Sequence, residues 1–343
     1  MPLPIAAIGG SLIPASIPSP PQSVWHLGPI PVRAYSICIL AGVALAVWWT
    51  DRRYRARGGR AELALDTAIL TVPIGIVCAR LYHVITSPDA YFGPNGDLAR
   101  VWRTWEGGIG IWGGVAGGLI SGALFLRHRG VRLAPFADAV APALLAAQAI
   151  GRFGNWFNQE LFGGPTALPW GLEIDRAHLP AGYAPGTLFH PTFLYEALWS
   201  AMGVCALLWL ERRLRGAGAC GGRLLWAYLM VYTSGRAWVE HLRIDDAQRV
   251  LGLRLNEWTS LVVFVIGLIG FIVVTRRGPS DAITADGAGP AEAPAGSGGA
   301  GPSAVVDEAG GADGGEPAGG SGTPTREKAD DPRGPRRAPT ELS

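Results

Sequence analysis

Residues 151–160 read Gly-Arg-Phe-Gly-Asn-Trp-Phe-Asn-Gln-Glu and follow an apolar segment that covers about residues 135–151. An arginine, two asparagines and a glutamate therefore lie at the end of a segment long enough to cross a bilayer. A charged side chain beside lipid is costly unless carboxylate, amide or phosphate groups accept its hydrogen bonds. Arg152 is therefore a candidate for a functional site, and the headgroup of an anionic phospholipid is the ligand that its chemistry favours.

Apolar segments of this kind recur along the chain. Hydrophobic residues make up 49% of the 343 residues, and seven segments have the length and apolar character of a membrane-spanning helix. The sequence therefore predicts an all-α polytopic integral membrane protein with seven transmembrane helices. The predicted helices cover about residues 33–50, 63–85, 109–127, 135–151, 191–210, 223–241 and 257–275.

Arginine clusters follow alternate predicted helices and indicate the orientation of the chain. Cytoplasmic loops of membrane proteins are enriched in arginine and lysine, so we expect the N-terminus outside and the C-terminus in the cytoplasm. The clusters are Arg52, Arg53, Arg55, Arg57 and Arg60, then Arg127, Arg129 and Arg132, then Arg212, Arg213, Arg215 and Arg223, and finally Arg276 and Arg277.

Composition divides the chain into three regions. We expect an extracytoplasmic N-terminal segment over residues 1–24, a seven-helix membrane domain over 25–278, and a disordered cytoplasmic tail rich in Gly, Pro and Ala over 279–343. From Asp281 onward the tail holds eleven acidic and five basic residues, a net charge of −6, so the remainder carries +8 to give the total of +2. The positive charge lies in short loops, which argues against a nucleic-acid partner.

Cysteines and the N-terminus exclude further classes of protein. The four cysteines, Cys38, Cys78, Cys205 and Cys220, show no paired or metal-ligand spacing, so we expect neither a disulfide framework nor a metal site. The first 25 residues lack a charged region and contain several prolines, so a cleaved signal peptide is not expected.

Polar residues from separate segments fall at one predicted depth. With a rise of about 1.5 Å per residue, Arg236 lies about 20 Å above the inner end of its helix, and Arg80 and Arg152 lie at about 27 Å, near the outer interface. Tyr35, Trp112 and His190 begin the first, third and fifth helices at the same level. We therefore expect one polar site near the outer surface.

Each candidate also has a purely structural interpretation. Gly151 and Gly154 favour a tight departure from the helix that presents Arg152, Asn155, Asn158 and Glu160 to a phosphate, but Arg152 could instead pair with Glu160. Arg236 and Glu240 share a helix face and could form a plain ion pair. Arg80 could snorkel to the interface, and His190 could be a general base or an interfacial hydrogen-bonding group.

In this order, the segments resemble the bacterial prolipoprotein diacylglyceryl transferase family over about residues 24–276. The resemblance implies an enzyme of the cell membrane that moves the diacylglyceryl group of phosphatidylglycerol to the lipobox cysteine of a preprolipoprotein. It implies a thioether product, release of glycerol phosphate, and no metal or organic cofactor. The similar segments are Leu27–Tyr35, Glu106–Gly118, Gly151–Glu160, His190–Glu196 and Gly235–Glu240.

The resemblance also implies roles for individual residues. Arg152 and Arg236 would bind the phosphate and stabilise the leaving group, while Tyr35, Asn155 and Glu160 would orient the lipid or the arginines. The family match extends to Gly163, just after the asparagine-rich element. The expected catalytic residues are Arg152, Arg236, His190 and Tyr35, and the expected substrate site comprises Arg152, Asn155, Asn158, Glu160, Gly163, Arg80, Trp112 and Glu240.

One position departs from the family pattern. Many members carry a histidine before the Gly-Gly pair where this sequence has Trp112, and indole has no basic nitrogen. Either His190 or Glu160 is then the base for the thiol, or nearby arginines lower the pKa of the thiol. The alternative function is a transporter or another phospholipid-binding membrane protein, but transporters gather polar groups near mid-membrane and not at one end.

Overall fold

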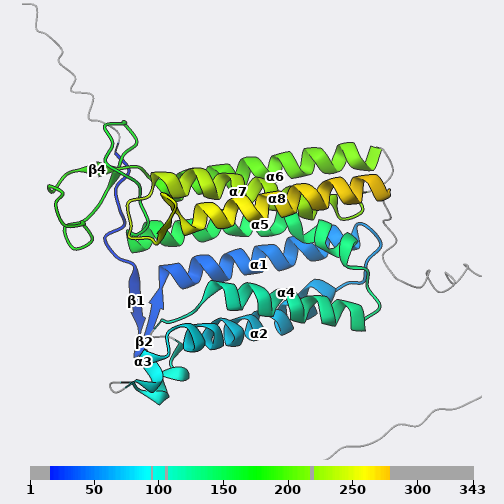
Figure 1. The fold of residues 1–343 in the computed structure, drawn as a ribbon, viewed down its shortest axis with the longest axis horizontal. Helices are drawn as coiled ribbons and strands as arrows, with labels where there is room; N and C mark the ends of the chain where they lie inside the picture. The colour runs from blue at the N-terminus through cyan, green and yellow to red at the C-terminus, as the bar shows by residue number, and fades with distance from the viewer. Residues whose placement is uncertain (1–15, 94–95, 105–106, 217–219, 279–343) are drawn as a thin grey trace, which may run out of the picture. The chain divides into compact units, whose positions relative to one another are not determined.

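The computed structural model describes residues 16–93, 96–104, 107–216 and 220–278. The predicted tail at 279–343 and residues 1–15 of the predicted N-terminal segment lie outside this described part. All described residues belong to one compact unit, Met1–Ala291. Within it, seven long helices lie side by side with their axes roughly aligned (Figure 1). These are α1 (Ala34–Arg55), α2 (Leu63–Thr86), α4 (Ile111–His128), α5 (Leu133–Asn158), α6 (Thr192–Gly216), α7 (Arg223–Leu242) and α8 (Leu255–Arg277).

These seven helices occupy the predicted positions, but several extend beyond the predicted bounds. Five of the described helices are long and apolar enough to cross a membrane: α1, α2, α5, α6 and α8. The other two, α4 and α7, do not meet the same criterion. In α7, Arg223, Arg236 and Glu240 lower the hydropathy, whereas α4 is only 18 residues long and ends on Arg127 and His128.

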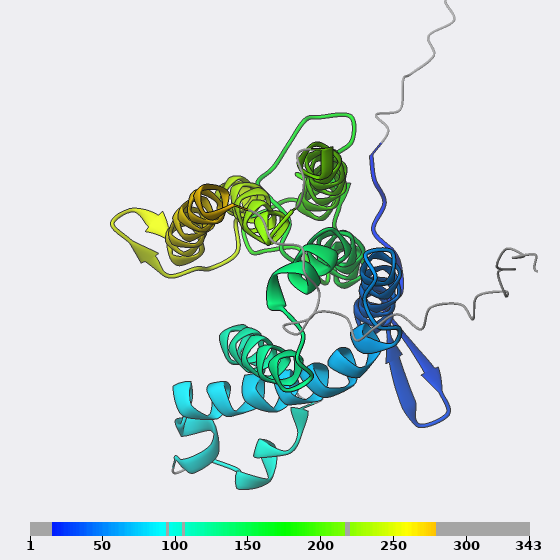
Figure 2. The same ribbon diagram turned by 90° about the vertical axis from the view of Figure 1, so that its right-hand side faces the viewer.

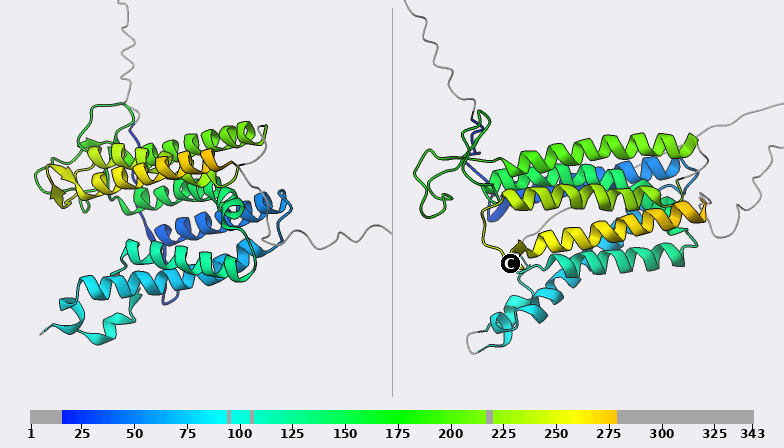
Figure 3. Two further views of the ribbon diagram at one scale, coloured as in Figure 1. Left: turned by 45° about the vertical axis from the view of Figure 1, so that its right-hand side comes forward. Right: turned by 45° about the horizontal axis from the view of Figure 1, so that its top comes forward.

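The prediction of an all-α fold is corrected to a mostly helical one. Three two-stranded antiparallel sheets lie outside the long helices within the described residues: one before α1, one between α5 and α6, and one between α7 and α8. A short helix and a 3₁₀ helix lie in the connection between α2 and α4. Figures 1 and 3 show that these connections gather at the same end of the helices, which we call the hairpin end. The elements are β1 (Val24–Leu27) with β2 (Ile30–Arg33), β3 (Leu172–Glu173) with β4 (Leu188–Phe189), β5 (Arg249–Val250) with β6 (Leu253–Arg254), α3 (Asp89–Phe92) and η1 (Leu98–Val101).

Helix α5 lies at the centre of the packing, and α1, α6 and α7 contact it (Figure 2). Ala139, Ala141 and Ala143 on α5 are fully buried, because small side chains let neighbouring helices approach closely. Leu145 of α5 packs with Leu207 of α6 in the same core cluster. By contrast, α2 and α8 expose many large apolar side chains, as expected for helices that face lipid.

The N-terminal segment crosses to the loop that follows α5. Ile17 forms a parallel bridge with Leu172, and Ser16 and Ser19 donate hydrogen bonds to Glu173. The indole of Trp156 donates to the Pro18 carbonyl at 3.1 Å. The segment before α1 is thereby attached to the hairpin end, next to the last turn of α5.

The opposite end, which we call the arginine end, holds the predicted arginine clusters. There Asp138 of α5 is 1% exposed and accepts hydrogen bonds from the backbone N–H groups of Gly222 (2.6 Å) and Leu224 (2.9 Å). These N–H groups begin α7 and have no partner within their own helix. Asp138 therefore caps a neighbouring helix and joins α5 to α7.

We expect Asp138→Ala to destabilise the protein by about 1–3 kcal/mol, because it leaves buried N–H groups without an acceptor. Asp138→Asn retains one carbonyl acceptor and should cost less. Thermal unfolding in detergent measures both effects. An unchanged melting temperature for Asp138→Ala would contradict the capping role.

Candidate functional site

Helix α5 carries Arg152 and Asn155 on its last two turns. The predicted departure from the helix at Gly151 and Gly154 is wrong, because α5 continues to Asn158 and ends at Gln159 with a left-handed φ of 50°. Gly154 instead permits close packing: a Cβ atom there would lie 2.7 Å from Cδ2 of Tyr35 on α1. The aromatic ring of Tyr35 thus lies against the helix that presents Arg152.

Glu196 of α6 joins two arginines that are far apart in the sequence. Its Oε2 lies 2.6 Å from Nε of Arg152, and its Oε1 lies 3.4 Å from Nη1 of Arg236 on α7. The Glu196 side chain is only 10% exposed, and a buried carboxylate is costly without such partners. The structure therefore brings Arg152 and Arg236 together on one carboxylate.

Both arginines keep donors that the protein does not use. Arg152 uses Nε for Glu196 and Nη1 for a long contact of 3.5 Å with Oδ1 of Asn155. Within the described ranges, Nη2 of Arg152 and Nε of Arg236 have no hydrogen-bond or ion-pair partner. Their side chains are 20% and 18% exposed, so a ligand can reach them. An anion with several acceptor oxygens matches this pair of guanidinium groups.

Glu160 lies just beyond the end of α5 and accepts hydrogen bonds from two amides. Asn155 Nδ2 donates to Glu160 Oε1 at 2.8 Å, and Asn158 Nδ2 donates to the same oxygen at 3.3 Å. The direct pair between Arg152 and Glu160 that we considered is not formed among the described residues, since Arg152 binds Glu196 instead. Asn155 connects the two, and Tyr35 lies within the electrostatic field of both.

Arg236 and Glu240 form the expected ion pair, with Nη2 2.8 Å from Oε2. Glu240 is fully buried and also contacts Nη1 of Arg243 at 3.3 Å and Nε of Arg254 at 2.9 Å. Asp245 in turn pairs with both of these arginines. A buried carboxylate surrounded by three guanidinium groups is not accessible to a ligand, so Glu240 fixes the position of Arg236.

Gly163 and His190 lie where three segments meet at the hairpin end. The Gly163 N–H donates to the His190 carbonyl at 3.0 Å, and Gly163 also bridges to Arg243. A Cβ atom at position 163 would lie 2.8 Å from Cβ of His190 and 3.0 Å from the Leu242 carbonyl oxygen. The imidazole Nδ1 of His190 is 3.1 Å from the Tyr195 hydroxyl. Gly163 therefore permits a close crossing of backbones beside α7.

Arg80 does not snorkel to the interface, and that interpretation is wrong. Arg80 is only 6% exposed. Its guanidinium donates hydrogen bonds to the carbonyl oxygens of Val101 (2.9 Å) and Gly108 (2.7 Å) and lies over the ring of Tyr91. It organises the connection between α2 and α4. Among the described contacts, neither Arg80 nor Trp112, which is 48% exposed at the start of α4, touches Arg152, Glu196 or Arg236.

Sequence reasoning missed Glu196 and the arginines around Glu240. Glu196 ends the segment His190–Glu196, and its neighbours Leu194, Ala197 and Leu198 on α6 are apolar and give no sign of an ion pair. The available signal was charge balance, because arginines placed beside lipid require carboxylates on nearby helices. Within the described ranges, no group of three or more His, Cys, Asp or Glu residues could hold a metal ion.

Comparisons with known proteins agree on one family. The model of the family "Prolipoprotein diacylglyceryl transferase" matches residues 22–273. Phosphatidylglycerol–prolipoprotein diacylglyceryl transferase 2 of Streptomyces coelicolor is 53% identical over 266 residues, which cover 77% of this chain and 83% of that protein. The corresponding transferase of Cutibacterium acnes is 51% identical over 262 residues, 76% of this chain and 88% of that protein.

Gly163 provides a test of the backbone crossing. We expect Gly163→Ala to cost about 1–3 kcal/mol, because the added methyl group meets backbone atoms that have little room to move. Gly164→Ala is the matched control, since its Cβ would lie 3.8 Å from the nearest atom, in the side chain of Ile244. Thermal unfolding of the two purified variants compares them. Equal melting temperatures would show that the crossing tolerates a side chain.

Proposed function

The chain belongs to the prolipoprotein diacylglyceryl transferase family, and we propose that Arg152 and Arg236, bridged by Glu196, form the centre of its active site. The protein is a multi-pass membrane enzyme, a phosphatidylglycerol–prolipoprotein diacylglyceryl transferase. The observation that carries the proposal is the meeting of the two guanidinium groups on one buried carboxylate.

The reaction requires a positive site for the departing phosphate. The thiolate of the lipobox cysteine attacks the glycerol carbon that carries the phosphate ester. A C–S bond forms as the C–O bond to phosphate breaks, and the electron pair leaves with glycerol phosphate. Negative charge therefore grows on the phosphate oxygens in the transition state. Guanidinium donors that are already in place stabilise this charge most effectively in a site of low dielectric constant.

Glu196 acts as a positioning residue in this proposal. A lone arginine side chain has many rotamers, and fixing one at the moment of reaction costs entropy. Glu196 binds Nε of Arg152 and Nη1 of Arg236, and Nη2 of Arg152 and Nε of Arg236 are left for the ligand. Glu240 holds Nη2 of Arg236 from the opposite side. The arginines are thereby oriented before the phospholipid arrives.

The other predicted residues fall into two groups. Tyr35, Asn155, Asn158 and Glu160 lie beside Arg152, and we assign them to orientation of the lipid or of that arginine. His190 is bound to Tyr195, and Trp112 has no basic nitrogen. We therefore propose that the arginine field favours the thiolate form of the substrate cysteine, in place of a dedicated base.

We propose that all seven long helices cross the membrane. The 18 residues of α4 extend about 27 Å at a rise of 1.5 Å per residue, close to the thickness of the hydrocarbon core. In α7, Arg236 and Glu240 are paired inside the protein, and Arg223 is the first residue of the helix, at the arginine end. The arginine end then faces the cytoplasm together with the tail at 279–343, and the hairpin end and residues 1–24 face outward.

The proposal is tested with purified enzyme, phosphatidylglycerol and a lipobox peptide. We expect Arg152→Ala and Arg236→Ala each to lower kcat/KM by about 10²–10³, as the loss of one donor to a developing negative charge does in other enzymes. Arg249→Ala is the matched control, because Arg249 is an exposed arginine at the same end. Unchanged turnover in both site variants would refute the assignment.

Glu196→Gln separates a role in positioning from a role in binding. The variant retains the size of the side chain but removes the negative charge between the arginines. We expect kcat to fall by about 10²-fold, since small misplacements of catalytic groups have effects of this size. KM for phosphatidylglycerol should not rise, because the uncompensated guanidinium groups still attract phosphate. A higher KM at unchanged kcat would show that Glu196 serves binding and not orientation.

A further inference from the structure

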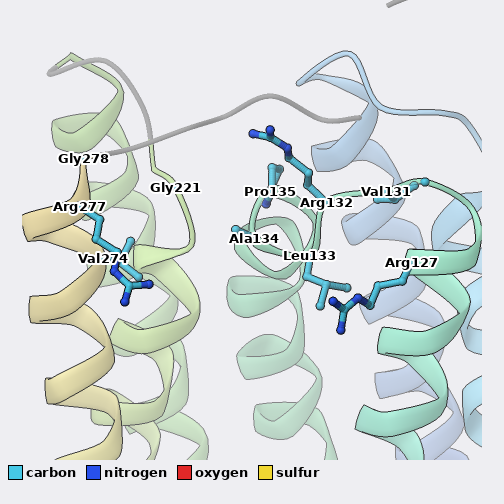
Figure 4. A pocket seen from close by; sticks show the side chains of 11 residues that line it. Arg127, Val131, Arg132, Leu133, Ala134, Pro135, Gly221, Val274, Arg277 and Gly278 are labelled. Carbon is cyan, nitrogen blue, oxygen red and sulfur yellow. The ribbon is translucent and has the colours of Figure 1, made fainter. Parts of the chain in front are cut away.

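A second basic site lies at the arginine end, at the opposite end of α5 from Arg152. An open pocket of about 640 Å³ is lined by the end of α4, the start of α5, Gly221 and the end of α8 (Figure 4). Arg127, Arg132 and Arg277 line it together with Val131, Leu133 and Val274. Three arginines and several apolar side chains therefore surround one space that the proposed reaction does not use.

Two of these arginines differ from the arginines at this end that are paired with carboxylates. Arg53, Arg57 and Arg215 all pair with Glu211 at 2.7–2.9 Å. Within the described ranges, Arg127 and Arg277 have no carboxylate within ion-pair distance. Figure 4 shows Arg127 and Arg277 on opposite sides of the first turn of α5, with the Arg127 side chain directed toward Leu133 and the Arg277 side chain beside Val274. Their positive charge is thus available to an anion from outside the protein.

The pocket walls indicate which anion fits. Val131, Leu133, Pro135 and Val274 supply apolar surface next to the guanidinium groups. A free inorganic anion gains no free energy from contact with apolar side chains. A phospholipid can bind the arginines through its phosphate and contact the apolar side chains through its acyl chains. Basic pockets between transmembrane helices at the cytoplasmic side bind the headgroups of anionic lipids.

We propose that this pocket binds the phosphate headgroup of an anionic phospholipid from the cytoplasmic leaflet. The assignment to that leaflet rests on the proposed orientation, but the site is independent of the roles given to Arg152 and Arg236. The competing occupant is the acidic tail of the chain, whose sequence begins directly after Gly278 and carries a net charge of −6. The Gly, Pro and Ala residues of the tail match the apolar walls less well than acyl chains do.

The test measures lipid binding and not turnover, so its failure is distinct from failure of the proposed function. The full chain in neutral detergent is titrated with phosphatidic acid, and bound lipid is counted by native mass spectrometry. The pocket variant is Arg127→Gln with Arg277→Gln. The matched control is Arg213→Gln with Arg276→Gln, which removes the same charge from exposed arginines at the same end that do not line the pocket.

We expect the tightest phosphatidic acid site to weaken about 30-fold in the pocket variant, the effect of losing two arginines near a membrane surface, and to remain nearly unchanged in the control. Equal weakening in both variants would overturn the proposal in favour of general charge attraction. Displacement of the lipid by millimolar inorganic phosphate would identify a free anion as the ligand. Much tighter lipid binding after deletion of residues 279–343 would identify the tail as the occupant.

Discussion

The ion pairs of Glu196 determine how the rest of the site is arranged. An arginine near hydrocarbon is tolerated only when its charge is paired. The Glu196 carboxylate on α6 pairs with Arg152 on α5 and with Arg236 on α7. The same contacts fix how these three helices pack, because each partner lies on a different helix. The packing of these helices and the proposed chemistry thus depend on one group, because the same carboxylate holds both arginines of the proposed phosphate site.

A second carboxylate supports the first. Glu240 is completely buried, and Arg236, Arg243 and Arg254 surround it. Two of these arginines also bind Asp245 in the connection between α7 and α8. Arg236 therefore lies between an accessible part of the site and a closed one. The closed part holds the α7–α8 connection in place, and the accessible part retains donors for a ligand.

Helix positions could be predicted from the sequence, but several contacts could not. Apolar length located α2 and α7 to within one residue, because the bilayer sets the length of a spanning helix. The same criterion ended α5 too early at Gly151, since it cannot show that Tyr35 fills the space beside Gly154. The predicted environment of Arg80 was wrong, because the hydrogen-bond acceptors of its guanidinium are carbonyl oxygens 21 and 28 residues further along the chain. Glu196 was missed because its partners come from other helices.

The distribution of the central ion pairs over α5, α6 and α7 has a consequence for biogenesis. Chains emerge from the ribosome N-terminal end first, so α5 leaves the ribosome before its counter-charge on α6 has been synthesised. Arg152 is costly beside lipid until Glu196 follows it, which favours insertion of α5 and α6 as a pair. Arg236 joins only with α7. A nascent chain therefore completes the proposed phosphate-binding centre only after most of the membrane domain has been synthesised.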